Sequence, residues 1–235
     1  MSRFADRRDA GRRLAEAVAG RFAADASVSA VPGPDVSGPD VVVLGLPRGG
    51  VPVADEVAHA LAAPLDVLVV RKLGVPHRPE VAMGAVGEGG TVVWNDDVLA
   101  QARVPHGELR RIEARERAEV ESRVARFRSG RAAAPIEGRT AVIVDDGVAT
   151  GATARVACRV ARAMGAARVV LAVPVAAPDS LADLVGDGTA DEVVRLAAPP
   201  GFMAVGMHYL DFAQTPDAEV VAILADADSR VRGGG

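Results

Sequence analysis

The chain has 235 residues, of which 49% are hydrophobic and 25% are charged, and its formal net charge is −4. Its 25 glycines and 15 prolines make up about 17% of the chain, below the roughly 25–30% typical of low-complexity proteins. Global disorder and a collagen-like structure are therefore excluded, and the acidic balance predicts no nucleic-acid partner. The length predicts one α/β domain with additions, with two small domains as the alternative.

The cysteine count and the hydropathy of the chain indicate the cellular compartment of the protein. The chain has one cysteine, Cys158, which excludes an internal disulfide framework and a Cys-rich zinc site and fits a reducing compartment. No apolar run reaches the roughly 18–20 residues of a membrane helix. The basic N-terminus also contains acidic residues and lacks a following apolar block, which argues against a signal peptide. We therefore expect a cytoplasmic protein with no membrane partner.

Hydrophobic periodicity predicts the elements of the N-terminal half. Leu14, Val18 and Phe22 recur at helical spacing, so residues 4–24 are expected to form a helix. After it we expect a loop over 26–39, a buried strand over 41–46, a helix over 51–61 and a second buried strand over 66–70. The Gly- and Pro-rich residues 74–90 are expected to form a mobile loop, followed by a strand over 92–94.

The C-terminal half continues the alternation of strands and helices. We expect a charged helix over 107–129 and strands over 140–146, 167–175 and 191–196. One helix is expected to follow the first of these strands and end near 164, and a second is expected over 180–185. A last helix is expected to begin at Thr215–Pro216, with a frayed tail over 226–235. The charged helix is either a solvated helix with one packed stripe or a dimer contact. Buried strands alternating with helices predict an α/β fold with a mostly parallel sheet of about five strands and helices on both faces.

The most informative segment is AVIVDDGVATGAT, residues 141–153, in which a strand leads through two carboxylates into a Gly- and Thr-containing turn and a helix. A Gly-rich turn at a helix N-terminus directs amide N–H groups at an anion. Asp145 and Asp146 would repel a phosphate but suit sugar hydroxyls or a hydrated divalent metal. A ligand that is anionic at one end and hydroxylated beside it is a sugar phosphate. The alternative, an Asp turn before a capped helix, explains only one Asp and one Thr.

This segment resembles the phosphoribosyl-pyrophosphate motif of type I phosphoribosyltransferases: hydrophobic residues, two acids, two variable positions, a small residue and Thr-Gly-x-Thr. Two further segments match in the right order. GLPRGGVPVA, residues 45–54, resembles the family's pyrophosphate loop, which often contains an unusual peptide bond, and VVRKLG, residues 69–74, resembles the end of the next strand. The resemblance implies one domain over 1–235, with its core at about 40–200, a helical insertion at about 96–131, and a hood at about 197–215 together with the C-terminal helix.

The resemblance implies Mg²⁺-dependent transfer of a 5-phosphoribosyl group between pyrophosphate and a nitrogenous base. Asp145 and Asp146 would hold the ribose hydroxyls and, directly or through water, the Mg²⁺. Arg48 and Lys72 would stabilise the departing pyrophosphate. The implied substrate-binding residues are Pro47, Gly49, Gly50 and Arg71 for the diphosphate, and Gly147, Val148, Ala149, Thr150, Gly151, Ala152 and Thr153 for the 5′-phosphate. The implied ligands are phosphoribosyl pyrophosphate or a nucleoside monophosphate, and pyrophosphate.

Three features qualify the resemblance. Lys72 is the only lysine among 27 basic residues, which favours a specific role over that of a surface lysine. Ala149 stands where the 6-oxopurine branch has an acidic general base, which weakens a hypoxanthine or guanine assignment. The orotate branch has several basic residues in a mobile loop, whereas residues 74–90 offer only His77 and Arg78, either of which could be a ligand or merely solvated.

Aromatic residues gather near the C-terminus. The chain has seven aromatics, and Phe202, Tyr209 and Phe212 lie within eleven consecutive residues. Aromatic rings stack on bases, and the family's C-terminal hood covers the acceptor. We expect these rings to form a lid, with Phe202 and Tyr209 binding the base and Asp211 or Gln214 reaching its edge. A small structural core or a dimer contact explains the cluster equally well.

Two other functions fit the same motifs. A non-catalytic regulator could keep the nucleotide pocket to sense a nucleotide or phosphoribosyl pyrophosphate, and a hydrolase could pass the ribose to water. The basic pair Arg48 and Lys72 favours catalysis, because a protein that binds only a nucleoside monophosphate needs no pyrophosphate loop. The acceptor and the oligomeric state are left open, with a homodimer possible.

Overall fold

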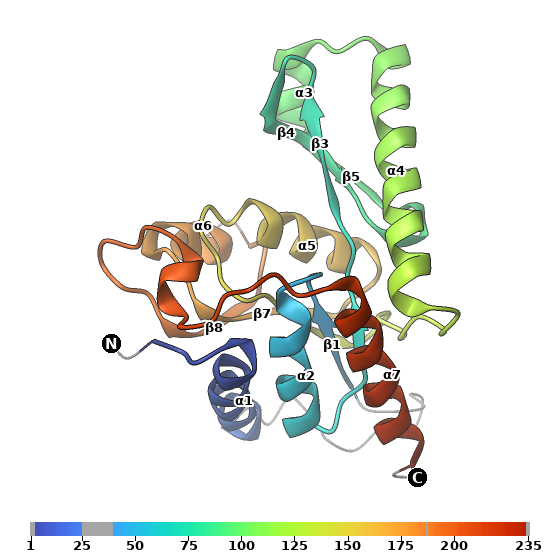
Figure 1. The fold of residues 1–235 in the computed structure, drawn as a ribbon. Helices are drawn as coiled ribbons and strands as arrows, with labels where there is room; N and C mark the ends of the chain where they lie inside the picture. Colours follow the sequence, from blue (N-terminus) through green and yellow to red (C-terminus); the bar gives the residue numbers. More distant parts are fainter. Residues whose placement is uncertain (1–2, 25–39, 187, 234–235) are drawn as a thin grey trace.

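The computed structural model describes residues 3–24, 40–186 and 188–233, so the loop expected over 26–39 lies outside the described residues. A five-stranded sheet with the order β2-β1-β6-β7-β8 forms its centre, and every neighbouring pair is parallel (Figure 1). The strands are β1 (Val41–Gly45), β2 (Leu65–Val67), β6 (Thr140–Val144), β7 (Arg168–Val175) and β8 (Glu192–Ala197). The expected parallel sheet of about five strands is confirmed.

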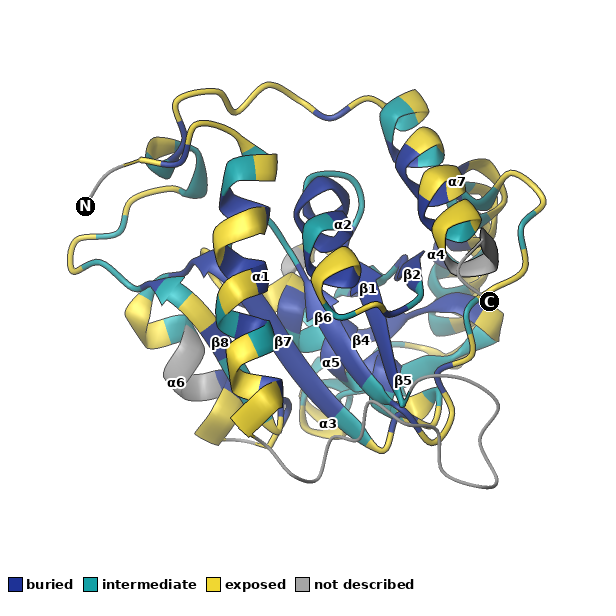
Figure 2. Ribbon diagram, turned by 90° about the horizontal axis from the view of Figure 1, so that it is seen from below, coloured by how far each residue is buried: buried dark blue, intermediate teal, exposed yellow. Residues whose placement is uncertain are grey.

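Helices cover both faces of this sheet. On one face lie α1 (Arg7–Ala24), α2 (Gly50–Ala60) and α7 (Asp217–Gly233), and on the other α5 (Ala152–Ala163) and α6 (Pro178–Gly186) (Figure 2). Alternate strand residues belong to two separate cores: Val43 and Val142 pack with the first group of helices, and Val42 and Ile143 with the second. Burial on both faces explains why these strands are continuous apolar runs.

The second part of the structure is an arm, residues 71–128, that projects from the sheet (Figure 1). It contains a three-stranded antiparallel sheet of β3 (Arg71–Val75), β4 (Arg78–Val86) and β5 (Val92–Trp94), with a short 3₁₀ turn η1 (Glu88–Gly90) before β5. Two helices complete it, α3 (Asp96–Ala102) and the long α4 (His106–Arg128). Both helices lie within residues 96–131, where a helical insertion is expected, and the arm also includes the three strands that start at Arg71.

The expectation of a mobile loop over 74–90 is wrong, because most of that segment forms β3 and β4. Its glycines allow close packing. A Cβ on Gly84 would lie 2.8 Å from Cε3 of Trp94, and one on Gly87 would lie 2.2 Å from Cγ1 of Val160. These glycines therefore bring β4 against Trp94 and its following turn against α5.

The ends of three other elements differ from expectation. The strand expected over 66–70 ends at Val67, and the chain then crosses to β3. The tail expected to fray continues as α7 to Gly233, because Val220, Ile223 and Leu224 are buried in the core. Phe4 precedes α1 and pairs with Tyr209 in an isolated parallel bridge. Among the described residues, no helix has the length and apolar character needed to span a membrane.

Candidate functional site

Two loops leave the same edge of the parallel sheet side by side. Gly45 of β1 is paired with Val144 of β6, so the PRGG loop (residues 47–50) and the acidic turn (residues 145–151) start from adjacent positions. The amide of Leu46 donates to the carbonyl of Val144 at 2.9 Å. The Pro47–Arg48 peptide bond is cis, the kind of unusual bond that the resemblance implied in this loop. This edge holds the carboxyl ends of the strands, where ligands bind in open α/β sheets.

Glycine allows the PRGG loop to touch the acidic turn. A Cβ on Gly50 would lie 2.5 Å from the carbonyl oxygen of Val144 and 2.9 Å from Cα of Asp145. A Cβ on Gly49 would lie 2.0 Å from Oδ2 of Asp146. A side chain at Gly50 would push the two loops apart, because it would meet backbone atoms, and one at Gly49 would displace the Asp146 carboxylate.

Asp145 and Asp146 are both partly buried, and each lies next to the charge of the other. The amide of Asp146 donates to Oδ1 of Asp145 at 2.9 Å. Burial raises the pKa of Asp145 well above its ordinary value, and the neighbouring charge of Asp146 raises it further. Burial also raises the pKa of Asp146, but the guanidinium of Arg7 opposes that shift. A bound cation or a set of hydroxyl donors would therefore stabilise the charged pair.

The rest of the acidic turn can receive an anion. It is anchored by an amide bond from Val148 to the carbonyl of Val175 at 2.9 Å and by a bond from Ser180 Oγ to the carbonyl of Ala149 at 2.6 Å. Within the described residues, the amides of Ala149, Thr150 and Gly151 donate to no protein group. Gly151 has a φ of 73°. Helix α5 starts at Ala152, so open N–H groups and the positive end of a helix dipole coincide here.

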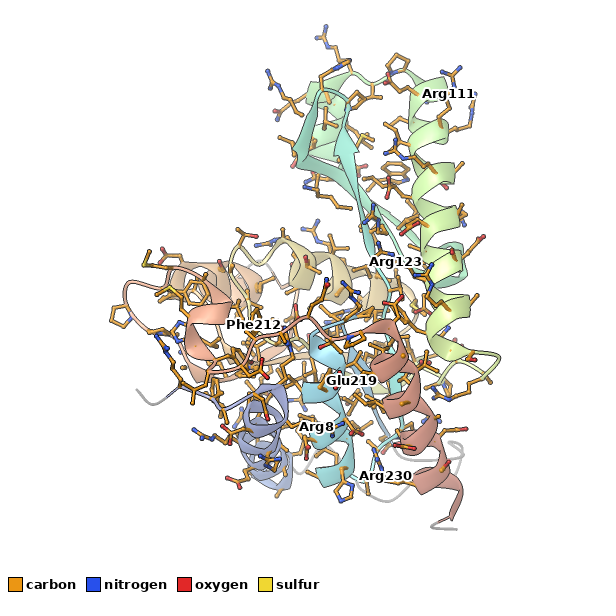
Figure 3. The ribbon with its side chains drawn as sticks, viewed as in Figure 1. Arg8, Arg111, Arg123, Phe212, Glu219 and Arg230 are labelled. Carbon is orange, nitrogen blue, oxygen red and sulfur yellow. The ribbon has the colours of Figure 1, made fainter. Side chains whose placement is uncertain are left out.

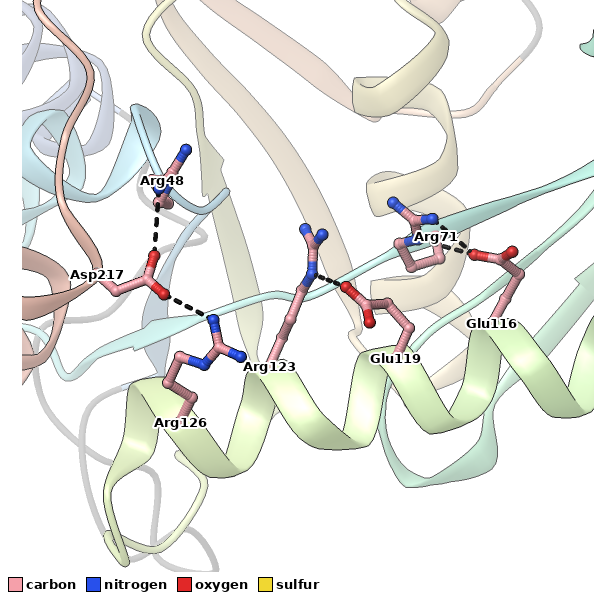
Figure 4. Close-up of polar contacts among 7 residues, drawn as sticks. All are labelled: Arg48, Arg71, Glu116, Glu119, Arg123, Arg126 and Asp217. Atoms are coloured by element: carbon pink, nitrogen blue, oxygen red, sulfur yellow. Dashed lines mark hydrogen bonds and ion pairs between the residues drawn. The ribbon is translucent and has the colours of Figure 1, made fainter.

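The predicted basic residues come from outside the turn. Arg48 pairs with Asp217 at the start of α7 at 3.3 Å, and Arg126 of α4 pairs with the other oxygen of Asp217 at 2.8 Å (Figure 4). Arg71 is bound by the buried Glu116 of α4 at 2.8 Å. The two ion pairs of Asp217 connect the arm to the PRGG loop, whereas the Arg71–Glu116 pair lies within the arm.

Lys72 occupies a different element from the one expected. Arg71 and Lys72 begin β3 of the arm and do not end a core strand, which corrects the expectation. Lys72 is exposed and lines a cavity of about 200 Å³ together with Trp94 and with Thr150 and Ala152 of the phosphate-facing segment. The structure thus brings the only lysine to the acidic turn from the arm side.

The aromatic residues separate into different environments. The ring of Tyr209 is 3% exposed and packs on Phe4 and Phe212, and its hydroxyl donates to the carbonyl of Asp146 at 2.6 Å. Tyr209 is therefore not free to stack on a base, and its predicted role in the lid is corrected to support of the acidic turn. Phe202 is partly buried and stacks on His208, with ring centroids 5.5 Å apart, and its role in base binding remains a prediction.

Sequence reasoning missed Arg7. Its Nε donates to Oδ2 of Asp146 at 2.8 Å, its Nη1 donates to the carbonyl of Ala213 at 2.6 Å, and its guanidinium lies 4.1 Å from the ring centroid of Phe212. Figure 3 shows Phe212 in the segment that leads to α7. Asp211 and Gln214 of that segment are exposed and line a cavity of about 430 Å³ with Arg7. Nothing in the sequence distinguishes Arg7 from the many other arginines.

The described residues contain no group of three or more His, Cys, Asp or Glu side chains that could hold a metal ion by themselves. Asp145 and Asp146 offer two carboxylates beside an anion-receiving turn. Magnesium is usually bound by one or two carboxylates together with substrate phosphates. The residues present therefore fit Mg²⁺ that arrives with a phosphorylated ligand.

Comparison with known proteins gives consistent results. A model of the phosphoribosyl transferase domain matches residues 16–187. Two curated proteins of Mycobacterium tuberculosis strains, provisionally named phosphoribosyl transferases, are each 54% identical over 224 residues, which is 95% of this chain and 47% of theirs. The chain therefore spans about half the length of those relatives.

Solved structures add a close match in shape. A Thermus thermophilus protein superposes with a TM-score of 0.82 at 46% identity, covering 95% of this chain and 98% of its own. A protein from Aquifex aeolicus superposes with a TM-score of 0.51 at 13% identity, covering 93% of this chain and 84% of its own, and indicates the fold alone. The first match accounts for nearly the whole chain, arm included.

Proposed function

Because the chain belongs to the phosphoribosyl transferase domain family, we propose that it is a Mg²⁺-dependent phosphoribosyltransferase that uses phosphoribosyl pyrophosphate. The observation that supports this most is the contact of the PRGG loop with the acidic turn, in which Gly50 lies too close to the backbone of Val144 and Asp145 for a side chain. A diphosphate loop beside a ribose-binding carboxylate pair suits a donor that carries both groups.

Each part of the edge has a role in this proposal. The open amides of the acidic turn bind the 5′-phosphate, and the carboxylates of Asp145 and Asp146 accept hydrogen bonds from the ribose hydroxyls. Arg48 and Lys72 neutralise the diphosphate. Bound Mg²⁺ would supply further positive charge to the diphosphate as it leaves.

The reaction exchanges one bond at C1 of the ribose. The bond from C1 to the diphosphate oxygen breaks, pyrophosphate leaves with the electron pair, and a nitrogen lone pair of the acceptor forms the new bond. The developing positive charge on the ribose is stabilised by the nearby carboxylates. Ala149 cannot act as a general base. The acceptor nitrogen must therefore either lose its proton to another group or be a nitrogen that carries no proton when it attacks.

The test is pyrophosphate release from phosphoribosyl pyrophosphate, with and without Mg²⁺ and with and without a panel of purine and pyrimidine bases. A transferase releases pyrophosphate only when metal and the right base are both present. Release without any base would indicate a hydrolase, and tight donor binding with no release under any condition would indicate a regulator. The Asp145→Asn variant should lose release, and Asp226→Asn, a change at an exposed carboxylate of α7, should retain it.

A further inference from the structure

Arg7 joins three parts of the chain that are distant in sequence. It belongs to the first turn of α1, its partner Asp146 follows β6, and Phe212 and Ala213 precede α7. Only 13% of the Arg7 side chain and 14% of the Asp146 side chain are exposed. A cation at this depth is held by specific contacts, because an unpaired buried charge is strongly destabilising.

Arg7 contacts one of the two oxygens of the Asp146 carboxylate. Oδ2 accepts the Nε–H of Arg7, and within the described part of the chain no other side chain is shown bonding or pairing with this carboxylate. This contact to one oxygen restrains the rotation of the carboxylate, so the second oxygen, Oδ1, has a preferred direction. A Cβ on Gly49 would lie 3.1 Å from Nε of Arg7, which places this ion pair directly against the PRGG loop.

The same guanidinium also fixes the hood. Nη1 donates to the carbonyl of Ala213, and the cation lies over the ring of Phe212. The preceding residues add backbone bonds, from the amide of Phe4 to the carbonyl of His208 and from the amide of Leu210 to the carbonyl of Phe4, both at 2.8 Å. Arg7 thus links the hood to the Asp146 carboxylate, in addition to the bond from the Tyr209 hydroxyl to the Asp146 carbonyl.

We propose that Arg7 is a positioning residue for the donor site, holding Oδ2 of Asp146 so that Oδ1 is directed at a ribose hydroxyl. This inference rests on the proposed function. Arginine suits the role because its planar fork donates in two directions at once and stacks on an aromatic ring, which the point charge of lysine does not reproduce. Arg7 acts through Asp146 and does not itself contact the transferred group.

The experiment compares Arg7→Gln and Arg7→Lys with Arg12→Gln, an exposed arginine of the same helix. Calorimetry measures the affinity for phosphoribosyl pyrophosphate with Mg²⁺ and, separately, for pyrophosphate with Mg²⁺, and thermal unfolding checks that each variant is folded. Arg7→Gln should lower the affinity for phosphoribosyl pyrophosphate about tenfold or more, and should change the affinity for pyrophosphate less than about twofold. Arg7→Lys should retain part of the affinity, and Arg12→Gln should match the wild type.

Several results would overturn the inference. Unchanged donor affinity in folded Arg7→Gln protein would show that Asp146 needs no fixed partner. Tighter binding would mean that Arg7 blocks the site, and equal losses for both ligands would mean a general structural role. In each of these cases the proposed function stands, because the wild type binds the donor. Failure of the wild type itself to bind phosphoribosyl pyrophosphate would contradict the proposed function and this inference with it.

Discussion

Asp145 and Asp146 follow a strand in which every residue from Ala141 to Val144 is buried, whereas Arg48 and Arg71 are held by ion pairs on the arm and at the start of α7. The turn that carries the carboxylates follows directly from the core of the sheet, and Arg7 restrains the Asp146 carboxylate further. Each partner carboxylate has a second arginine, Arg126 for Asp217 and Arg115 for Glu116, so we expect Arg48 and Arg71 to be able to exchange it for a phosphate. A ligand that enters this edge therefore meets a preorganised acidic half and an adaptable basic half.

The comparison predicts the largest effect for a change between the two loops at the sheet edge. Gly50→Ala places a methyl group 2.5 Å from the carbonyl of Val144, and relieving such overpacking costs about 1–3 kcal/mol. We expect a lower melting temperature and at least about a hundredfold loss of donor affinity by calorimetry, because the PRGG loop must leave the acidic turn. Gly20→Ala is the control, since that position in α1 has open space and a helical alanine is favoured over glycine. Donor affinity that survives Gly50→Ala would refute the importance of the contact.

The second largest effect is expected for a change in the basic half of the site, at Lys72. Lys72→Ala should weaken phosphoribosyl pyrophosphate and pyrophosphate by about 10- to 100-fold, since a hydrogen bond to a charged group contributes about 1.5–3 kcal/mol. Ribose 5-phosphate should be affected far less, because it lacks the diphosphate. The matched control is Arg110→Ala on the exposed side of α4. Equal losses for all three ligands would mean that Lys72 acts only through general charge.

The two hood aromatics should separate base binding from donor binding. Phe202→Ala should weaken nucleoside monophosphates by about tenfold or more while donor binding stays nearly constant, because stacking on a ring contributes about 1–3 kcal/mol per base. Tyr209→Phe removes the bond to the carbonyl of Asp146 and should lower stability by about 1 kcal/mol. If Phe202→Ala loses stability without selective loss of base affinity, the acceptor site lies elsewhere.

The smallest effect concerns the link between the arm and the PRGG loop. Hydrogen bonding from Arg126 holds the pKa of Asp217 below its ordinary value, so the carboxylate is charged at neutral pH and the link is lost only as pH falls through that lowered pKa. Asp217→Asn should release Arg48 and raise pyrophosphate affinity about two- to fivefold at low salt. The gain should vanish at high salt, because exposed charges are screened. A gain in pyrophosphate affinity that persists at high salt would contradict this explanation. Asp226→Asn is the control, because it removes an exposed carboxylate elsewhere on α7.

The sheet and the acidic turn could be predicted because their signals are local. Continuous apolar runs identified β1 and β6, and the carboxyl ends of parallel strands meet at one edge, so residues 47–50 and 145–151 could be placed together. The arm could not be predicted in this way. Gly84 and Gly87 are typical of a loop when seen in sequence, and only the packing of Trp94 and Val160 against them explains their presence in and beside a strand.

The site residues that escaped prediction depend on contacts across the chain. Arg7 is separated from Asp146 by 139 positions, and in an arginine-rich chain its residue type carries no signal. The cluster of scarce aromatics identified a segment whose rings contact one another and the N-terminus, and the role of Phe202 in base binding stays a prediction. Composition could not show that Tyr209 is buried whereas Phe202 is only partly buried against the same cluster, because that depends on which ring the N-terminal residues cover.

The most direct test of the account is calorimetric titration of phosphoribosyl pyrophosphate, with and without Mg²⁺, into the wild type and the double variant Asp145→Asn/Asp146→Asn. Asp226→Asn serves as the control for loss of a carboxylate elsewhere. We predict Mg²⁺-dependent binding by the wild type and the control, and no Mg²⁺-dependent binding by the double variant, whose fold should remain intact by circular dichroism. Equal affinity in the wild type and the folded double variant would contradict the assignment of the acidic turn as the donor site.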